Sequence, residues 1–150
     1  MSFADRLRRV SLQRLVTEVP DSPRRLVVTA AVIERDDAFL VTRRLSGVHL
    51  AGYWEFPGGK CEPGESHVTC LVREIAEELD TSVLVGAEIF TIAHTYSDRV
   101  VQLHFFECEL MGEPRAALGQ EMRWVRRGEL ESLAFPPADE ELIRKLASRG

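Results

Sequence analysis

Three glutamates lie close together in the segment EIAEELD, at Glu74, Glu77 and Glu78. On a helix, like charges three and four positions apart repel by about 0.2–0.5 kcal/mol per pair. Two interpretations are open. The glutamates form a solvated helix face, which is the commoner place for this residue, or they surround a hard cation such as Mg²⁺, which prefers oxygen ligands and keeps several waters.

The helix that would carry these glutamates is predicted at residues 67–79, where Ser66 is suited to cap the N-terminus. Its apolar residues recur at helical spacing, at Val68, Leu71, Val72, Ile75 and Leu79. A helical wheel centres this apolar stripe on Val68 and Leu79. We therefore expect the three glutamates on the other side of the helix, with their carboxylates directed toward one volume.

Strands are predicted on both sides of this helix. Two β-branched runs flank Asp36-Asp37 and indicate a hairpin. The other expected elements are a short strand entering a glycine turn at 53–60, two strands around Ser97-Asp98 within 82–110, a strand at 121–125 and a final helix at 138–148. Strands and helices in this order predict an α/β or α+β domain.

The chain divides into two parts by composition. Residues 1–22 form an amphipathic lead-in arm, and Pro20 and Pro23 interrupt its pattern as linker residues do. Residues 23–150 form the domain, which is long enough for a single hydrophobic core.

A longer pattern contains the glutamates. Gly59 is followed after five residues by Glu65, and after seven more by Arg73-Glu74, Ile75 and Glu77-Glu78. This spacing resembles the Nudix box, G-x5-E-x7-R-E-U-x-E-E-x-G-U, in which U is aliphatic.

The end of the box departs from the family pattern. Asp80 stands where the family has Gly, and Thr81 where it has an aliphatic residue. Asp tolerates the left-handed conformation that Gly would adopt there better than most residues do. We expect a small local cost and no effect on a metal ligand.

The segments HLAGYWEFPGGKCEPGES and LESLAFPPADEELIRKL resemble the bacterial MutT and CTP pyrophosphohydrolase branch of this family. The resemblance covers about residues 26–147. It implies an α/β/α sandwich around a mixed β-sheet. It also implies the hydrolysis of a nucleoside triphosphate to the monophosphate and pyrophosphate, with Mg²⁺ or Mn²⁺ as cofactor and with 8-oxo-dGTP or a modified (d)CTP as substrate.

Residue roles follow from the resemblance. Arg73 would pair with Glu65, and a guanidinium fork suits a carboxylate. Lys60, with Arg43 or Arg44, would meet the phosphates. Glu121 would supply a further metal ligand or a base. The remaining metal ligands would be the Gly59 carbonyl and the carboxylates of Glu74, Glu77 and Glu78.

Asp139 has two interpretations. It stands where the best-known MutT proteins have Asn, so it is a candidate base reader; an ionised Asp only accepts hydrogen bonds and would favour an amine. It also precedes the final helix and suits an N-cap. Trp54, Phe56 and Phe135 are candidate walls of the base pocket, although aromatic residues in strands more often belong to the core.

Two other functions remain open: a Nudix hydrolase of ADP-ribose or another nucleoside diphosphate derivative, and a non-catalytic nucleotide sensor. Sensors usually lose the box carboxylates, which this chain keeps. The net charge of −5 argues against binding long nucleic acid, and the sequence predicts no membrane span.

Cysteine and histidine patterns add two expectations. Three scattered cysteines, without a C-x-x-C pair, argue against a disulfide framework and fit a reducing cytoplasm. The four histidines, at positions 49, 67, 94 and 104, show no zinc spacing, and His104 is expected to be a packed or edge residue. The sequence does not predict the oligomeric state.

Overall fold

The computed structural model describes residues 24–45 and 52–149. Seven strands form one mixed sheet in the order β3-β2-β1-β6-β5, with β4 paired to β1 and β7 paired to β2. The predicted lead-in arm, residues 1–22, lies outside the described residues. The strands are β1 (Arg24–Arg35), β2 (Ala38–Arg43), β3 (Trp54–Glu55), β4 (Gly58–Lys60), β5 (Val83–Thr95), β6 (Arg99–Leu110) and β7 (Glu121–Arg126).

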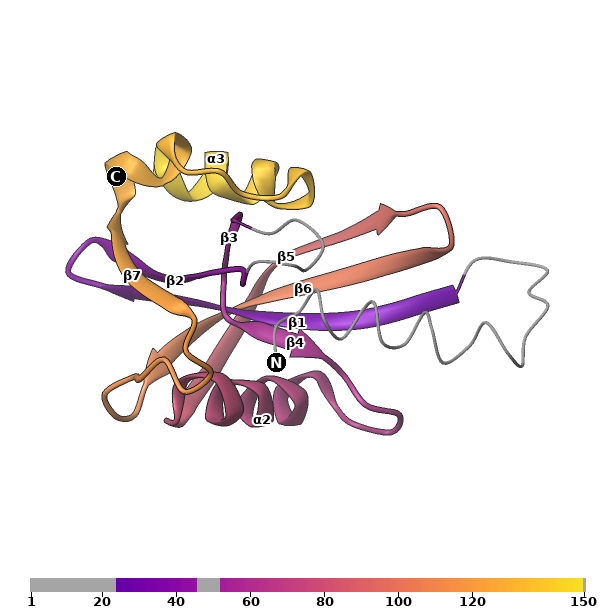
Figure 1. Cartoon of the computed structure of the whole chain (residues 1–150). Coiled ribbons are helices and arrows are strands. Elements are labelled where there is room, and N and C mark those ends of the chain that lie inside the picture. Colours follow the sequence, from indigo (N-terminus) through magenta and orange to yellow (C-terminus); the bar gives the residue numbers. More distant parts are fainter. Residues whose placement is uncertain (1–23, 46–51, 150) are drawn as a thin grey trace.

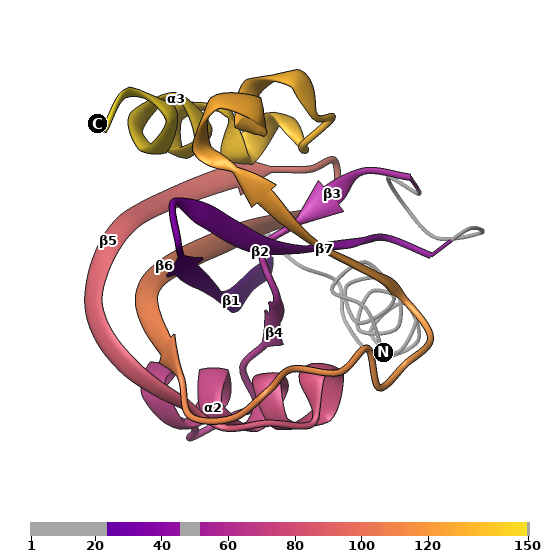
Figure 2. The same ribbon diagram turned by 90° about the vertical axis from the view of Figure 1, so that its left-hand side faces the viewer.

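Helices cover the sheet on both sides. Helix α2 (His67–Leu79) lies below the strands and α3 (Glu140–Ser148) lies above them in Figure 1, and Figure 2 shows the same layers from the side. Two short 3₁₀ turns, η1 (Arg127–Ser132) and η2 (Pro137–Asp139), lead into α3. The predicted α/β/α sandwich around a mixed sheet is therefore confirmed. Within the described residues, no helix has the length and apolar character needed to span a membrane.

The protein has two hydrophobic clusters, and strand β1 contributes to both. Leu26, Val28, Ala30 and Val32 join the cluster that includes α3, whereas Ala31 and Ile33 join the cluster that includes α2. A strand that is covered on both faces has apolar residues in succession rather than in alternation. This explains the run LVVTAAVI in the sequence.

Both predicted hairpins are confirmed, whereas Gly58 and Gly59, which were predicted in a turn, lie in strand β4. Asp36 and Asp37 connect β1 to β2 with φ angles of 52° and 61°, which is the two-residue turn whose twist matches that of the paired strands. Strands β5 and β6 pair in antiparallel fashion around Ser97-Asp98. β7 and α3 also form where the pattern predicts them.

Both ends of α2 have the predicted caps. The backbone N–H of Thr69 donates to the Ser66 hydroxyl at 3.1 Å. At the C-terminal end, Asp80 adopts φ 52° and ψ 40° and its N–H donates to the Ala76 carbonyl. Asp80 thus takes the left-handed conformation for which the family pattern has Gly.

The predicted orientation of α2 is partly wrong. Val68 is 49% exposed, whereas the side chains of Glu74 and Glu78 are buried. Helix α2 packs against β4, and the segment before β7 covers its C-terminal end, where Ala117 N and Gln120 Nε2 donate to the Glu78 carbonyl at 3.0 and 2.9 Å. A helical wheel locates the apolar stripe but does not show which other sides of the helix the chain covers.

Strand β4 approaches β1 so closely that Gly58 has no room for a side chain. A Cβ built there would lie 2.0 Å from the Thr29 carbonyl oxygen. We expect Gly58→Ala to lower the free energy of unfolding by about 2–3 kcal/mol, because β4 must move away from β1. Urea unfolding measures this. Gly128→Ala is the control, since no atom lies within 4 Å of its Cβ; equal losses in the two variants would contradict the prediction.

Candidate active site

Arg73 connects the glycine-containing strand β4 to helix α2. Its Nε and Nη2 donate to the two oxygens of Glu65 at 2.7 and 2.8 Å, and Nη2 also donates to the Lys60 carbonyl at 3.1 Å. The predicted Arg73–Glu65 pair is therefore present, in the two-bond fork that is specific to Arg. The hydrogen bonds from Arg73 lower the pKa of Glu65 to about 2, so this carboxylate stays ionised at neutral pH.

The same guanidinium brings two of the candidate ligands together. Arg73 Nη1 lies 2.8 Å from Glu74 Oε1 and 3.3 Å from Glu77 Oε1. The Glu74 side chain is fully buried, whereas that of Glu77 is 46% exposed. Arg73 therefore positions one buried and one accessible carboxylate at the same part of α2.

Glu78 lies one helical turn after Glu74 and lines a small cavity. The cavity is also lined by Thr42, Arg43, Leu45, Glu55, Leu118 and Gln120. Glu55 is shared with a second pocket on the α3 side of the sheet. Glu55 is therefore the residue that the cavity of Glu78 and the second pocket have in common.

The second pocket combines apolar walls with three buried ionisable groups. Arg44 Nε donates to Glu55 Oε2 at 2.9 Å, and Asp139 lies beside this pair in the pocket wall. The apolar walls include Phe56, Tyr96, Leu103 and Phe105. Ionisable groups are rarely buried unless they are paired or functional, so this pocket is a candidate binding site for a polar ligand.

The protonation of Asp139 depends on its burial. Burial raises its pKa to about 7, although the positive charge of Arg44 acts in the opposite direction. With a pKa near neutrality the carboxyl has both a form that donates and an ionised form that only accepts, and the role of Asp139 as an ionised acceptor stays a prediction. Asp139 is the residue before α3, but its side chain makes no capping hydrogen bond, which contradicts the N-cap interpretation.

The candidate aromatic walls occupy different places. Phe56 lines the pocket, and Phe135 stacks on it from behind with ring centroids 5.6 Å apart. Trp54 is not among the lining residues; the guanidiniums of Arg43 and Arg123 lie 5.6 and 5.9 Å from its ring. Of the three aromatic residues, Phe56 alone lines this pocket.

The candidate phosphate and outer metal residues lie around the α2 carboxylates. Arg43 faces Glu121 across the β2–β7 pair and lies 3.4 Å from it. Lys60 ends β4, beside Gly59, whose carbonyl accepts from the Cys70 thiol at 3.8 Å. Arg44, in contrast, lies in the pocket of Asp139, where it is paired with Glu55.

Glu55, Tyr96 and Gln120 were missed by sequence reasoning. A signal was available for Glu55, because a charged residue between Trp54 and Phe56 interrupts an apolar segment. No local pattern marks Tyr96 or Gln120.

Comparison with known proteins agrees with this geometry. Residues 28–145 match the model of the NUDIX domain. The chain belongs to the NUDIX domain family. The CTP pyrophosphohydrolase of Escherichia coli is 37% identical over 117 residues, covering 77% of this chain and 87% of that protein. The 8-oxo-dGTP diphosphatase of Haemophilus influenzae is 35% identical over 127 residues, covering 82% and 93%.

Structural similarity supports the same assignment. The solution structure of the E. coli ORF135 protein superposes with a TM-score of 0.74 at 34% identity, covering 85% of this chain and 91% of that one. The Nudix box of this chain is therefore placed on the fold that its relatives share.

The donors around α2 fit a hard divalent cation. Glu74 and Glu78 carry buried carboxylates one helical turn apart on α2. Buried carboxylates are retained when they are paired or bind a metal, and Mg²⁺ takes this type of ligand. The Nudix residues present are thus chemically suited to the ion.

Arg73 is expected to affect both catalysis and stability. Replacing it with Ala removes the fork to Glu65 and the single hydrogen bond to Glu74, so we expect a 10- to 100-fold loss of kcat/KM, roughly as for other residues that orient metal ligands. The melting temperature should also fall, because buried Glu74 loses its counterion.

Arg73→Lys is the matched control for charge. It keeps the cation but not the two-bond geometry, so it should restore the melting temperature more than the activity. Steady-state kinetics beside thermal unfolding separate the two effects, and wild-type kcat/KM in Arg73→Ala would contradict the organising role.

Proposed function

We propose that this protein is a nucleoside triphosphate pyrophosphohydrolase that depends on Mg²⁺, with Mn²⁺ as a substitute. The observation that carries the proposal is the shared position of Glu55, which lines both the cavity of Glu78 and the pocket of Asp139. A nucleotide with its base beside Asp139 would direct its phosphates toward the α2 carboxylates. Family membership supports the same reaction class.

The box residues would hold the cation. Glu74, Glu77 and Glu78 supply carboxylates and Gly59 a carbonyl, and Glu121 at the start of β7 is an additional candidate. A bound divalent cation neutralises phosphate charge and lowers the pKa of water. Arg73 fixes the positions of Glu74 and Glu77. Lys60 and Arg43 stand near this site as partners for the phosphate oxygens.

The chemistry proposed is attack of water on a phosphorus of the triphosphate chain, which releases a nucleoside monophosphate and pyrophosphate. One carboxylate of the site accepts the proton of the water. The leaving pyrophosphate is a polyanion, so nearby cationic side chains favour its departure. No covalent enzyme intermediate is required.

The substrate class proposed is a damaged or modified nucleotide, either 8-oxo-dGTP or a modified (d)CTP. Arg44 and Asp139 would form hydrogen bonds with the polar edge of the base. The flat base would pack against Phe56 and Tyr96. The two relatives named above are described as acting on CTP and on 8-oxo-dGTP. Such activity would remove modified nucleotides from the precursor pool.

A substrate panel tests the proposal. Purified protein is incubated with 8-oxo-dGTP, dGTP, dCTP, 5-methyl-dCTP, dTTP and ADP-ribose, and pyrophosphate and phosphate are measured separately. We expect pyrophosphate from 8-oxo-dGTP or a cytosine nucleotide, loss of activity with EDTA and recovery with Mg²⁺. Turnover of ADP-ribose alone, or tight nucleotide binding without turnover, would overturn the proposal in favour of the other two functions.

A further inference from the structure

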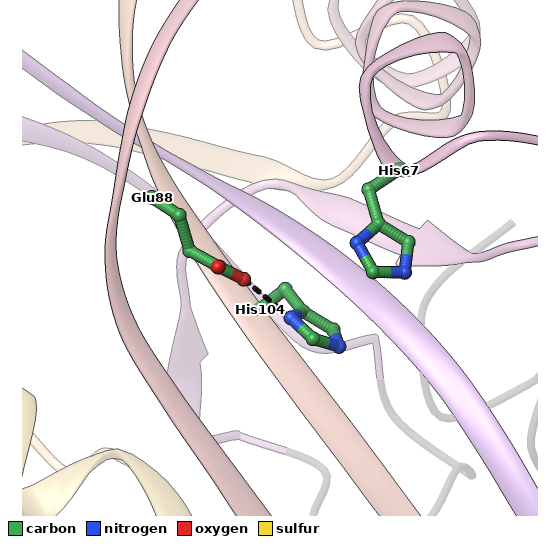
Figure 3. Close-up of side chains that lie close together, drawn as sticks. All are labelled: His67, Glu88 and His104. Atoms are coloured by element: carbon green, nitrogen blue, oxygen red, sulfur yellow. Dashed lines mark hydrogen bonds and ion pairs between the residues drawn. The ribbon is translucent and has the colours of Figure 1, made fainter.

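A second group of metal-ligand side chains lies away from the Nudix carboxylates. His67 is the first residue of α2, His104 lies in β6 and Glu88 lies in β5. One ligand atom from each lies within 4.8 Å of the others. Figure 3 shows the three side chains directed toward one another from these three elements. Glu74 follows His67 by seven residues on α2, about 10 Å along the axis, so this group is separate from the catalytic carboxylates.

The contacts within the group are close. Nδ1 of His104 and Oε1 of Glu88 are hydrogen-bonded. The rings of His67 and His104 have centroids 4.2 Å apart, and the edge of His67 packs against Phe106 at 6.5 Å. His104 is buried, whereas the Glu88 side chain is 40% exposed. The group thus has an apolar wall on one side and an opening to solvent on the other.

The backbone departs from a regular strand where it presents Glu88. The β5–β6 register shifts between Val85 and Glu88, and again between Glu88 and Phe90. An extra residue in one strand changes the direction in which a side chain points, and such bulges are common beside functional sites. Here the irregularity brings Glu88 to His104, although Thr91 is the direct partner of His104 in the ladder.

We propose that His67, His104 and Glu88 form a binding site for a first-row divalent cation of intermediate softness, of which Zn²⁺ is the best fit. Two imidazoles and one carboxylate are a frequent protein ligand set for zinc, with a water in the fourth position. On binding, the cation takes the place of the hydrogen bond between Glu88 and His104, so that Oε1 and Nδ1 become ligands. The site joins the N-terminus of α2 to β5 and β6, so occupancy stabilises the helix that carries the Nudix box.

Histidine-selective NMR tests the site in the intact protein. ¹⁵N-labelled protein in excess Mg²⁺ is titrated with Zn²⁺, so that the Nudix carboxylates are already supplied with a cation. We expect the ring nitrogens of His67 and His104 to shift or broaden by one equivalent, while those of His94 stay in place. Unmoved His67 and His104 resonances while Zn²⁺ binds elsewhere would overturn the proposal.

Variants extend the test to stability. Zn²⁺ should raise the melting temperature of the wild type, because a ligand that binds the folded state stabilises it. This shift should be lost in His67→Asn and in Glu88→Gln, which avoid changing buried His104. His94→Asn, whose ring contacts Tyr96 instead, should keep it. An undiminished shift in both site variants would overturn the proposal as well.

Discussion

Glu78→Gln is expected to abolish most of the turnover and to leave the protein at least as stable as the wild type. Glu78 is buried and lines a cavity that shares Glu55 with the pocket of Asp139. Loss of a ligand to the catalytic metal removes several kcal/mol of transition-state stabilisation, and about 4 kcal/mol corresponds to roughly a thousandfold in kcat. Gln has the same shape without the charge, so burying it costs less.

The combination of the two readouts is what distinguishes a catalytic carboxylate from a structural one. A structural role would lower the melting temperature together with activity. The matched control is Glu109→Gln at an exposed position of β6, which should change neither quantity. Activity within tenfold of the wild type in Glu78→Gln, measured at saturating Mg²⁺ by pyrophosphate release, would contradict the assignment of Glu78 as a ligand.

The second large effect is expected from Asp139→Asn. Because burial raises the pKa of Asp139 to about 7, the wild-type carboxyl donates a hydrogen bond below neutral pH and only accepts above it. A purine carbonyl oxygen requires a donor, whereas an amine requires an acceptor. The ratio of kcat/KM for 8-oxo-dGTP over dCTP should therefore fall as the pH rises through about 7, and Asn should make this ratio independent of pH.

The size of this change in the kcat/KM ratio depends on how completely the base is desolvated. Sites built around a buried polar group reject a mismatched partner by as much as about 10⁴-fold, so a change of at least tenfold in the ratio between about pH 6 and pH 8 is expected. A ratio that follows the same pH curve in wild type and Asp139→Asn would place base selection elsewhere.

Stability gives an independent check on the same group. A carboxyl whose pKa is higher in the folded state than in the unfolded state binds more protons when folded, so stability falls as the pH rises from about 4 to about 7. Asn does not titrate. The melting temperature of Asp139→Asn should therefore exceed that of the wild type by more at about pH 8 than at about pH 5.

The local pattern of the sequence was sufficient for most of the fold. Ser66, the spacing of Leu71, Ile75 and Leu79, and the pair Asp36-Asp37 each act through neighbours a few residues away, and their elements form as predicted. The Arg73–Glu65 pair was also predictable, because its spacing belongs to the Nudix box. These features depend on short-range geometry or on a motif that specifies it.

The features that the sequence did not predict depend on segments that are far apart along the chain. Burial of Glu74 and Glu78 requires β4 and the segment before β7 to cover α2. The raised pKa of Asp139 requires burial in a pocket built from several strands. His67 and His104 are 37 positions apart and meet because α2 packs on the face of the sheet that carries His104, which no ligand spacing along the chain reveals.

The parallel pairing of β1 with β6 also has a consequence for folding kinetics. Its partners, such as Arg24 and Arg99, are 75 positions apart, and parallel pairs cannot be joined by a tight turn. During synthesis, β1 therefore leaves the ribosome long before β6 does. Until β6 is made, this edge of the apolar strand β1 stays unpaired and exposed. Pairings of such high contact order form slowly and expose intermediates to aggregation. Refolding yield should consequently depend steeply on protein concentration, even though the α2 segment and the β1–β2 hairpin form from local contacts.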